Sequence, residues 1–306
     1  MLHAAVAVLS VVFACVVSPL LLERVTERSH SPRGGALAWL ALCAAAVLLA
    51  FGAVAVLAAA VLPHHEGAHG GHADHGFPAG YAWQVLLAVL VCAVAVRVGM
   101  VGASTLRRNR AVRERHLSVL RVVGRGSGDD YTVLEAGEPA VYCIRPDTIV
   151  VTTGALDALS GEELAAVLAH ERAHLSGRHH DVLAVLHVLR RALPFLPVFP
   201  KAEAAVACLF EVCADDVAAR QHGRRALATA LARLTCRDAP ASSLAASGPG
   251  AVGRVTRLLR PPGPWARQGS AVGLLLCAVA LVLTPLATSF GPSLLMVAAG
   301  RCPFSV

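Results

Sequence analysis

Residues 160–177 have the sequence SGEELAAVLAHERAHLSG, and this stretch decides the fold of the region around it. Ser160 followed three residues later by Glu163 is the pattern of a capping box, which begins an α-helix. Apolar residues then recur at helical spacing until Gly177 supplies a stop signal. The stretch therefore predicts one helix that carries the motif His170-Glu171-Arg172-Ala173-His174.

The two histidines of this motif are spaced to share a metal ion. Residues four apart lie on the same face of a helix, so His170 and His174 can turn ring nitrogens toward one ion, with Glu171 beside them. This spacing indicates zinc, which needs a third protein ligand and one open position if it is to act on water. We predict one catalytic Zn²⁺ held by His170 and His174, with Glu171 as the catalytic base.

The third ligand is expected on a downstream helix over residues 202–221 that contains Glu211-Val212-Cys213-Ala214-Asp215. We predict Glu211 as this ligand. Asp215 lies one turn further on the same face, where its carboxylate can accept the free ring N–H of a ligating histidine. Asp215, Asp216 and Cys213 are competing candidates for the ligand position.

The composition indicates a membrane protein. Apolar residues make up 56% of the 306 residues and charged residues 15%, and the mean hydropathy is +0.62. The net charge of +7 comes almost wholly from arginine, and we expect no direct binding of nucleic acid because no basic stretch is interleaved with aromatic residues. Four segments have the length and composition of spanning helices. They are residues 4–22, 35–62, 77–96, and a stretch within 269–300.

Arginine asymmetry predicts the orientation of these spans. Arginines cluster after the first span, after the third and before the fourth, whereas the loop over residues 63–76 has neither Lys nor Arg. We therefore predict a multi-pass bacterial plasma membrane protein with three domains. Residues 1–106 form three spans with a His-rich outward loop at 63–76, residues 107–268 form a cytoplasmic zinc metallopeptidase domain, and residues 269–306 form the fourth span and a short outward tail.

Three short β-branched or aromatic runs precede the metal helix, over residues 131–134, 140–144 and 148–152, and they predict a small sheet. A helix over residues 181–193 is expected to end at Pro194, Pro197 and Pro200. The fold class is thus an α-helical membrane protein with four transmembrane helices and an inserted α+β zincin domain.

The runs Ala140 to Ile144 and Ile149 to Thr152, with Glu162 to His174 and Glu211 to Asp215, carry a resemblance over nearly the whole chain. The chain resembles the BlaR/MecR-type antirepressor metallopeptidases and, more distantly, the HtpX-type proteases. This resemblance implies a gluzincin that cleaves a cytoplasmic regulator, in the antirepressors a winged-helix repressor of the BlaI/MecI type. An extracellular penicillin-binding domain after the fourth span is part of the antirepressor pattern. The residues that follow the fourth predicted span in this sequence are too few to form one, so we do not expect antibiotic sensing from them.

In zincins of this kind the strand before the metal helix commonly receives the substrate backbone, which here points to Ala140, Val141, Tyr142, Cys143 and Ile144. Two other functions remain open. One is an HtpX-like membrane quality-control protease. The other is a metal-binding membrane sensor whose structural zinc site is closed by a fourth ligand, Cys213 or Asp215.

The remaining histidines give weaker indications. His179, His180 and Asp181 follow the metal helix and are interpreted as structural, although they could support the ligands or line the cleft. The outward loop holds His64, His65, His69, His72 and His75, and its binding of metal stays open, as do the activating signal, the scissile bond, any zymogen processing, the second oxyanion donor and the oligomeric state.

Overall fold

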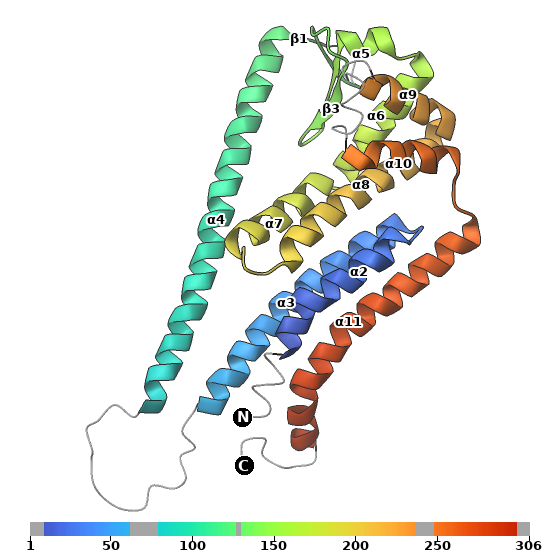
Figure 1. Cartoon of the computed structure of the whole chain (residues 1–306). Helices are drawn as coiled ribbons and strands as arrows, with labels where there is room; N and C mark the ends of the chain where they lie inside the picture. The colour runs from blue at the N-terminus through green and yellow to red at the C-terminus, as the bar shows by residue number, and fades with distance from the viewer. Residues whose placement is uncertain (1–8, 62–78, 127–129, 237–247, 299–306) are drawn as a thin grey trace, which may run out of the picture.

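The computed structural model describes residues 9–61, 79–126, 130–236 and 248–298. Long helices form one end of the molecule, and a small sheet with shorter helices forms the other (Figure 1). The His-rich loop lies outside the described residues, so its predicted role is not addressed by the structure.

The N-terminal helices form an apolar hairpin. A short π-helix, η1 (Phe13–Val17), continues into α2 (Ser18–Glu27), and the chain then turns back into α3 (Pro32–Val61). Helix α11 (Pro264–Ala298), from the other end of the sequence, packs along α3 (Figure 1). Within the described residues three helices are long and apolar enough to cross a membrane: Leu9–Glu27, Pro32–Ala50 and Ala88–Val123. These helices indicate association with a membrane.

The fourth predicted span stays a prediction, because the apolar part of α11 among the described residues is the shorter stretch Gln268–Leu283. The third predicted span belongs to a much longer helix. Helix α4 (Ala79–Val123) has 45 residues and a length of about 68 Å, roughly twice the hydrocarbon core of a bilayer. It continues beyond Arg97 because neither proline nor a capping sequence interrupts it there.

The predicted sheet is confirmed, with one strand that the sequence analysis missed. Strands β2 (Thr132–Leu134), β3 (Val141–Ile144) and β4 (Thr148–Thr152) match the three predicted runs. The missed strand is β1 (Gly124–Gly126), whose two glycines give no strand signal. The order is β1-β2-β4-β3, with β2 and β4 parallel and the other pairs antiparallel. Strand β3 therefore lies at an edge of the sheet.

Six helices lie between the sheet and α11 in the described parts of the chain. They are α5 (Thr153–Ala158), α6 (Gly161–Ser176), α7 (His179–Ala192), α8 (Val198–His222), α9 (Arg224–Cys236) and α10 (Gly248–Leu259). Helix α6 is the predicted metal helix, and its capping box between Ser160 and Glu163 is present in both directions. Gly177 is its C-cap, as predicted.

Two predicted helix boundaries are wrong. Helix α8 begins at Val198 rather than at residue 202, because Pro200 lies in the first turn, where a missing backbone N–H costs nothing. Helix α7 begins at His179 rather than at Asp181, because the sharp turn between α6 and α7 is made at Arg178, which adopts a left-handed conformation with φ of 51°.

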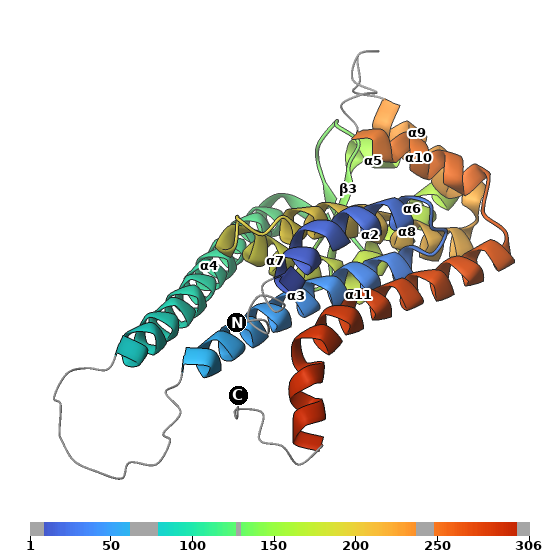
Figure 2. The same cartoon turned by 60° about the horizontal axis from the view of Figure 1, so that its bottom comes forward.

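One apolar core joins the apolar hairpin to the helices of the other end. Buried side chains from α3 and α11 pack in the same cluster as side chains from α7 and α8, among them Trp39, Leu274, Leu186 and Phe199. Helix α8 lies against the hairpin of α2 and α3, and α7 packs between α8 and α4 (Figure 2). Burial of this shared surface holds α8, which carries Glu211, at the end of the apolar helices.

Candidate metal centre

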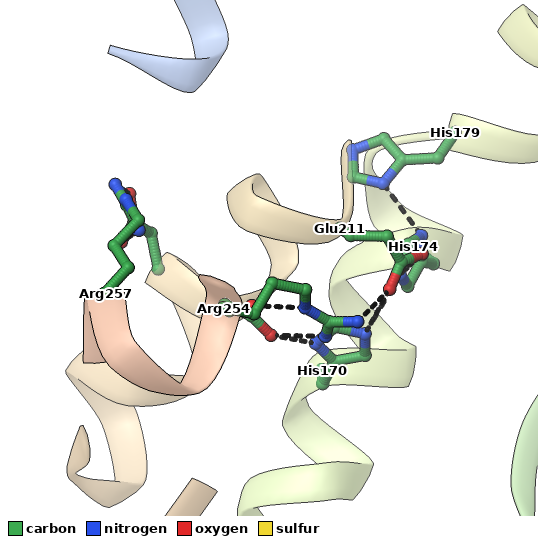
Figure 3. A network of polar contacts seen from close by, with 8 residues as sticks. His170, His174, His179, Glu211, Arg254 and Arg257 are labelled. Carbon is green, nitrogen blue, oxygen red and sulfur yellow. Dashed lines mark hydrogen bonds and ion pairs between the residues drawn. The ribbon is translucent and has the colours of Figure 1, made fainter. Parts of the chain in front are cut away.

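Helices α6 and α8 pack against each other and bring three ligand-type side chains together (Figure 3). His170 and His174 on α6 are both buried, and their Nε2 atoms lie 3.1 Å apart. Glu211 on α8 places Oε1 at 3.3 Å from His174 Nε2 and Oε2 at 3.6 Å from His170 Nε2. The structure thus brings the three predicted ligands into one cluster.

The donor atoms of this cluster fit a zinc ion. Zinc–nitrogen and zinc–oxygen bonds of about 2.0–2.1 Å in a tetrahedron place neighbouring donors about 3.3 Å apart. The two histidine nitrogens lie 3.1 Å apart, and Glu211 Oε1 lies 3.3 Å from His174 Nε2, both near that value. The distance of 3.6 Å to His170 Nε2 is measured from the other carboxylate oxygen of Glu211, and one donor atom from each of the three residues lies within 4.8 Å of the other two. Two imidazoles and one carboxylate also form the donor set typical of catalytic zinc, in which a fourth position is left for water or substrate.

Each histidine has its second ring nitrogen next to a buried partner. Asp215 Oδ1 lies 3.1 Å from His170 Nδ1, and the Asp215 side chain is only 2% exposed. His174 Nδ1 lies 3.0 Å from Nδ1 of His179. The contact between His170 Nδ1 and Asp215 is an ion pair rather than an aligned hydrogen bond. With the Nδ1 atoms of both histidines facing these partners, the two Nε2 atoms face each other and Glu211 between α6 and α8.

His179 was interpreted as structural from the sequence, and the structure gives it a specific contact to the cluster. Its ring stacks on Phe210, with ring centroids 4.1 Å apart and planes inclined by 8°. The His179 ring can occupy this position because residue 177 is glycine: a Cβ on residue 177 would lie only 2.5 Å from His179 Nε2. The turn after α6 therefore places the His179 ring between Phe210 and the ring of His174.

Arg254 was missed as a site residue, since the sequence analysis treated it only as part of an arginine cluster. It lies on α10, and its guanidinium donates two hydrogen bonds of 2.7 Å to the carboxylate of Asp215 and one of 2.8 Å to Glu211 Oε2 (Figure 3). The local sequence gives no signal for this contact, because Arg254 follows Asp215 by 39 positions and Glu211 by 43. Arg254 fixes the two carboxylates relative to each other.

The buried charges shift the pKa values of the cluster. Burial opposes protonation of His170, but Asp215 and Glu211 outweigh it and raise its pKa to about 9. Burial and the neighbouring His170 lower the pKa of His174 to about 4. The pKa of Glu211 is lowered because His170 and Arg254 outweigh the cost of its burial. Without metal, His170 therefore carries the proton of the cluster near neutral pH.

Glu171 lies beside the cluster and next to the edge strand. Burial raises the pKa of its carboxyl group, against the opposing effects of Cys143 and His170. Cys143 on β3 contacts Glu171, and its Sγ lies 3.3 Å from His180 Nε2. The predicted strand Ala140, Val141, Tyr142, Cys143 and Ile144 thus passes next to Glu171, and among the described residues no further strand pairs with its outer edge.

The competing ligand candidates are occupied elsewhere. Asp216 accepts two hydrogen bonds from Arg257, at 2.7 and 2.9 Å. Cys213 is buried, which raises the pKa of its thiol to about 11. Among the described residues neither Cys213 nor Asp215 belongs to the ligand cluster, so a fourth protein ligand that would close a structural zinc site is not provided there.

The histidine pair, the glutamate between them and the carboxylate from α8 define a metal-dependent peptidase centre. The family model for peptidase family M48 matches residues 106–261, and the chain belongs to this family of metallopeptidases. The matched segment contains every residue of the cluster, including Arg254. Comparisons with curated proteins and with solved structures find no match.

Proposed function

We propose that the chain is a membrane-embedded, zinc-dependent endopeptidase, with the metal held by His170, His174 and Glu211. The observation that supports the proposal is the cluster of three metal-binding side chains beside Glu171. Among the described residues no fourth side chain joins this cluster, which leaves the fourth coordination position of a zinc ion for water or substrate. Zinc bound there supplies a Lewis acid that polarises the peptide carbonyl and makes water more acidic. This arrangement is catalytic rather than structural.

The protein's own residues transfer the proton, orient the ligand histidines and bind the substrate. Glu171 accepts the proton of the attacking water and passes it to the leaving amine, and a carboxyl group whose pKa is raised by burial suits both transfers. Asp215 and His179 hold the two imidazoles in the tautomer with Nε2 free. The edge strand β3 pairs with the substrate backbone and places the scissile bond next to Glu171.

The proposed location is a bacterial plasma membrane, with residues 107–268 as a cytoplasmic peptidase domain between spans three and four. The arginine clusters near the ends of the apolar helices support this orientation. We propose that the substrate of the peptidase is a cytoplasmic regulator, a winged-helix repressor of the BlaI/MecI type. Cleavage of this repressor would transmit a signal. The resemblance to antirepressor metallopeptidases supports this assignment.

A second candidate is quality control of membrane proteins in the manner of the HtpX-type proteases. The packing of α8 on α3 favours it: a Cβ on Gly35 would lie 3.2 Å from Leu209 Cδ1, two residues before Glu211. The ligands are therefore held next to the apolar helices, where unfolded membrane segments would arrive.

The substitution Glu171→Gln tests the enzymatic function. The variant should keep one zinc per chain, because the three ligands remain, and should lose cleavage by a factor of at least about 100, because the base is gone. Zinc is measured by elemental analysis and cleavage by the fragments that accumulate in cells. If the variant and the unchanged protein produce the same fragments at the same rate, the chain is not the peptidase.

The same pair of proteins separates the two substrate classes. Fragments of one repressor that appear only with the unchanged protein support the regulatory function. Fragments of many membrane proteins, and none of a repressor, would replace it with quality control. His170→Ala serves as the control that loses both zinc and cleavage.

A further inference from the structure

A cavity of about 470 Å³ lies behind the metal helix, between the first turns of α3 and the helices α6 and α8. Its α3 wall includes Arg33, Leu37 and Leu40, and its opposite wall includes His179 and Phe210. The volume lies in the range of small-molecule sites. None of the three proposed ligands lines it, so the cavity is separate from the metal centre.

The wall formed by α3 belongs to an apolar helix. Arg33, Ala36, Leu37 and Leu40 follow the i, i+3, i+4, i+7 spacing of one helical face. They begin the segment Pro32–Ala50, which is long and apolar enough to cross a membrane. Leu37 is 67% exposed, and such an exposed leucine on a spanning helix is suited to contact with lipid. The cavity is therefore continuous with the surface that a bilayer would cover.

The rim of the cavity carries a positive charge. No ion pair joins Arg33 to a carboxylate within the described parts of the chain, and its side chain is exposed. Arg33 is itself one of the residues that line the cavity. Ser176 supplies a hydroxyl group in the same wall. One end of the cavity thus suits an anion, and the leucine side suits hydrocarbon.

We propose that this cavity binds an anionic phospholipid of the surrounding bilayer, with the phosphate at Arg33 and the upper part of an acyl chain along Leu37 and Leu40. Basic pockets beside spanning helices at the cytoplasmic membrane face are a recurring form of lipid recognition. The proposal rests on the membrane location given under the proposed function, and it does not depend on catalysis.

A lipid at this position touches the support of the metal centre. His179 lines the cavity and lies 3.0 Å from the ring of His174, and Phe210 precedes Glu211. A bound lipid therefore packs against the two aromatic rings that hold a ligand histidine in place. Loss of the lipid is expected to increase the rate at which zinc leaves the protein.

The test uses the full chain in nanodiscs of phosphatidylcholine with phosphatidylglycerol. Native mass spectrometry counts the retained lipids, and a chelator assay measures the rate of zinc loss. Arg33→Gln should lower the retention of phosphatidylglycerol about five-fold, as expected for one arginine at a membrane surface. Leu37→Trp should lower it by filling the cavity. Arg28→Gln, five residues away and outside the cavity, should leave it unchanged.

Two results would overturn the proposal. One is equal retention of phosphatidylglycerol by the Arg33→Gln, Leu37→Trp and Arg28→Gln proteins. The other is retention of phosphatidylcholine to the same extent as phosphatidylglycerol by the unchanged protein, which would remove the role of charge. Glu171→Gln should bind lipid like the unchanged protein, so a failure of the proposed peptidase function is distinguished from a failure of lipid binding.

Discussion

Arg254 links the two carboxylates that serve the metal centre. Its side chain is 18% exposed, and its donors to Glu211 and Asp215 are charge-assisted hydrogen bonds. By holding Glu211 Oε2, it leaves Oε1 directed toward His174 Nε2. Arg254 therefore acts as a positioning residue, and its effect is expected first on the affinity for zinc.

Arg254→Ala should weaken zinc binding by about 10–100-fold, the usual range for loss of a group that orients a metal ligand. Zinc affinity is measured by competition with a chelator. Arg257→Ala is the matched control: it lies one turn away on α10 and binds Asp216, so its loss breaks a contact between α10 and α8 without touching the ligands. Equal weakening in both variants would mean that Arg254 only attaches α10.

Zinc binding should release one proton near neutral pH. The pKa of His170 is raised to about 9, whereas His174 has a pKa of about 4 and Glu211 is ionised, so one donor is protonated in the metal-free protein. Because zinc displaces this proton, the apparent affinity should fall about tenfold for each unit of pH below the raised pKa. Calorimetric titrations in buffers of different ionisation enthalpy count the proton. Release of none at about pH 7.5 would show that His170 is already neutral.

At the scale of the element, α6 depends on its first turn. The hydroxyl oxygen of Ser160 accepts a hydrogen bond from the backbone N–H of Glu163. The carboxylate of Glu163 in turn accepts hydrogen bonds from the backbone N–H of Ser160 and from the side chain of Arg233 on α9. The capping box thus fixes the start of the metal helix and attaches it to a neighbour. The histidines lie further along the same helix, so the position of its first turn sets theirs.

Ser160→Ala should destabilise the protein by about 1 kcal/mol, because the N-cap acceptor is lost. The midpoint of thermal unfolding in detergent should fall by about 2–4 °C. Ser160→Asp keeps an acceptor and adds a charge that favours the start of a helix, so its midpoint should stay close to that of the unchanged protein. A similar fall in both variants would exclude capping as the cause.

At the scale of the whole molecule, the apolar helices share one core with α7 and α8. Helix α8 contacts α3 closely because Gly35 has no side chain, and Leu209 fills the space. The metal centre consequently depends on a helix of the hairpin formed by α2 and α3 as well as on the M48 segment. Insertion of a side chain at this contact is expected to displace the helix that bears Glu211.

Gly35→Leu should destabilise the protein by about 1–3 kcal/mol through overpacking, and zinc should be lost at a lower temperature than from the unchanged protein. Zinc retention during heating gives the measurement. Gly99→Leu adds the same side chain to α4, where a Cβ meets no heavy atom within 4 Å, and should have little effect. Unchanged zinc retention in Gly35→Leu would show that α8 is positioned without α3.

The sequence by itself determined the local features of this protein. The capping box, the spacing of His170 and His174, the three β-branched strands and the apolar helices each follow from patterns within one segment, because short-range geometry sets them. The choice of Glu211 as ligand was a prediction from a motif, and the sequence left Asp215, Asp216 and Cys213 open.

Only the tertiary structure decided the contacts between segments. It places Nε2 of both histidines next to Glu211, Asp215 next to His170, His179 on His174, and Arg254 on both carboxylates. These partners lie on four different helices, and their meeting depends on how α6, α7, α8 and α10 pack. One buried core joins α7 and α8 to the apolar helices, and a second joins α6, α8 and α10. No local pattern encodes this burial between segments. The motif His170-Glu171-Arg172-Ala173-His174 therefore specifies a pair of metal ligands, and the fold completes the site.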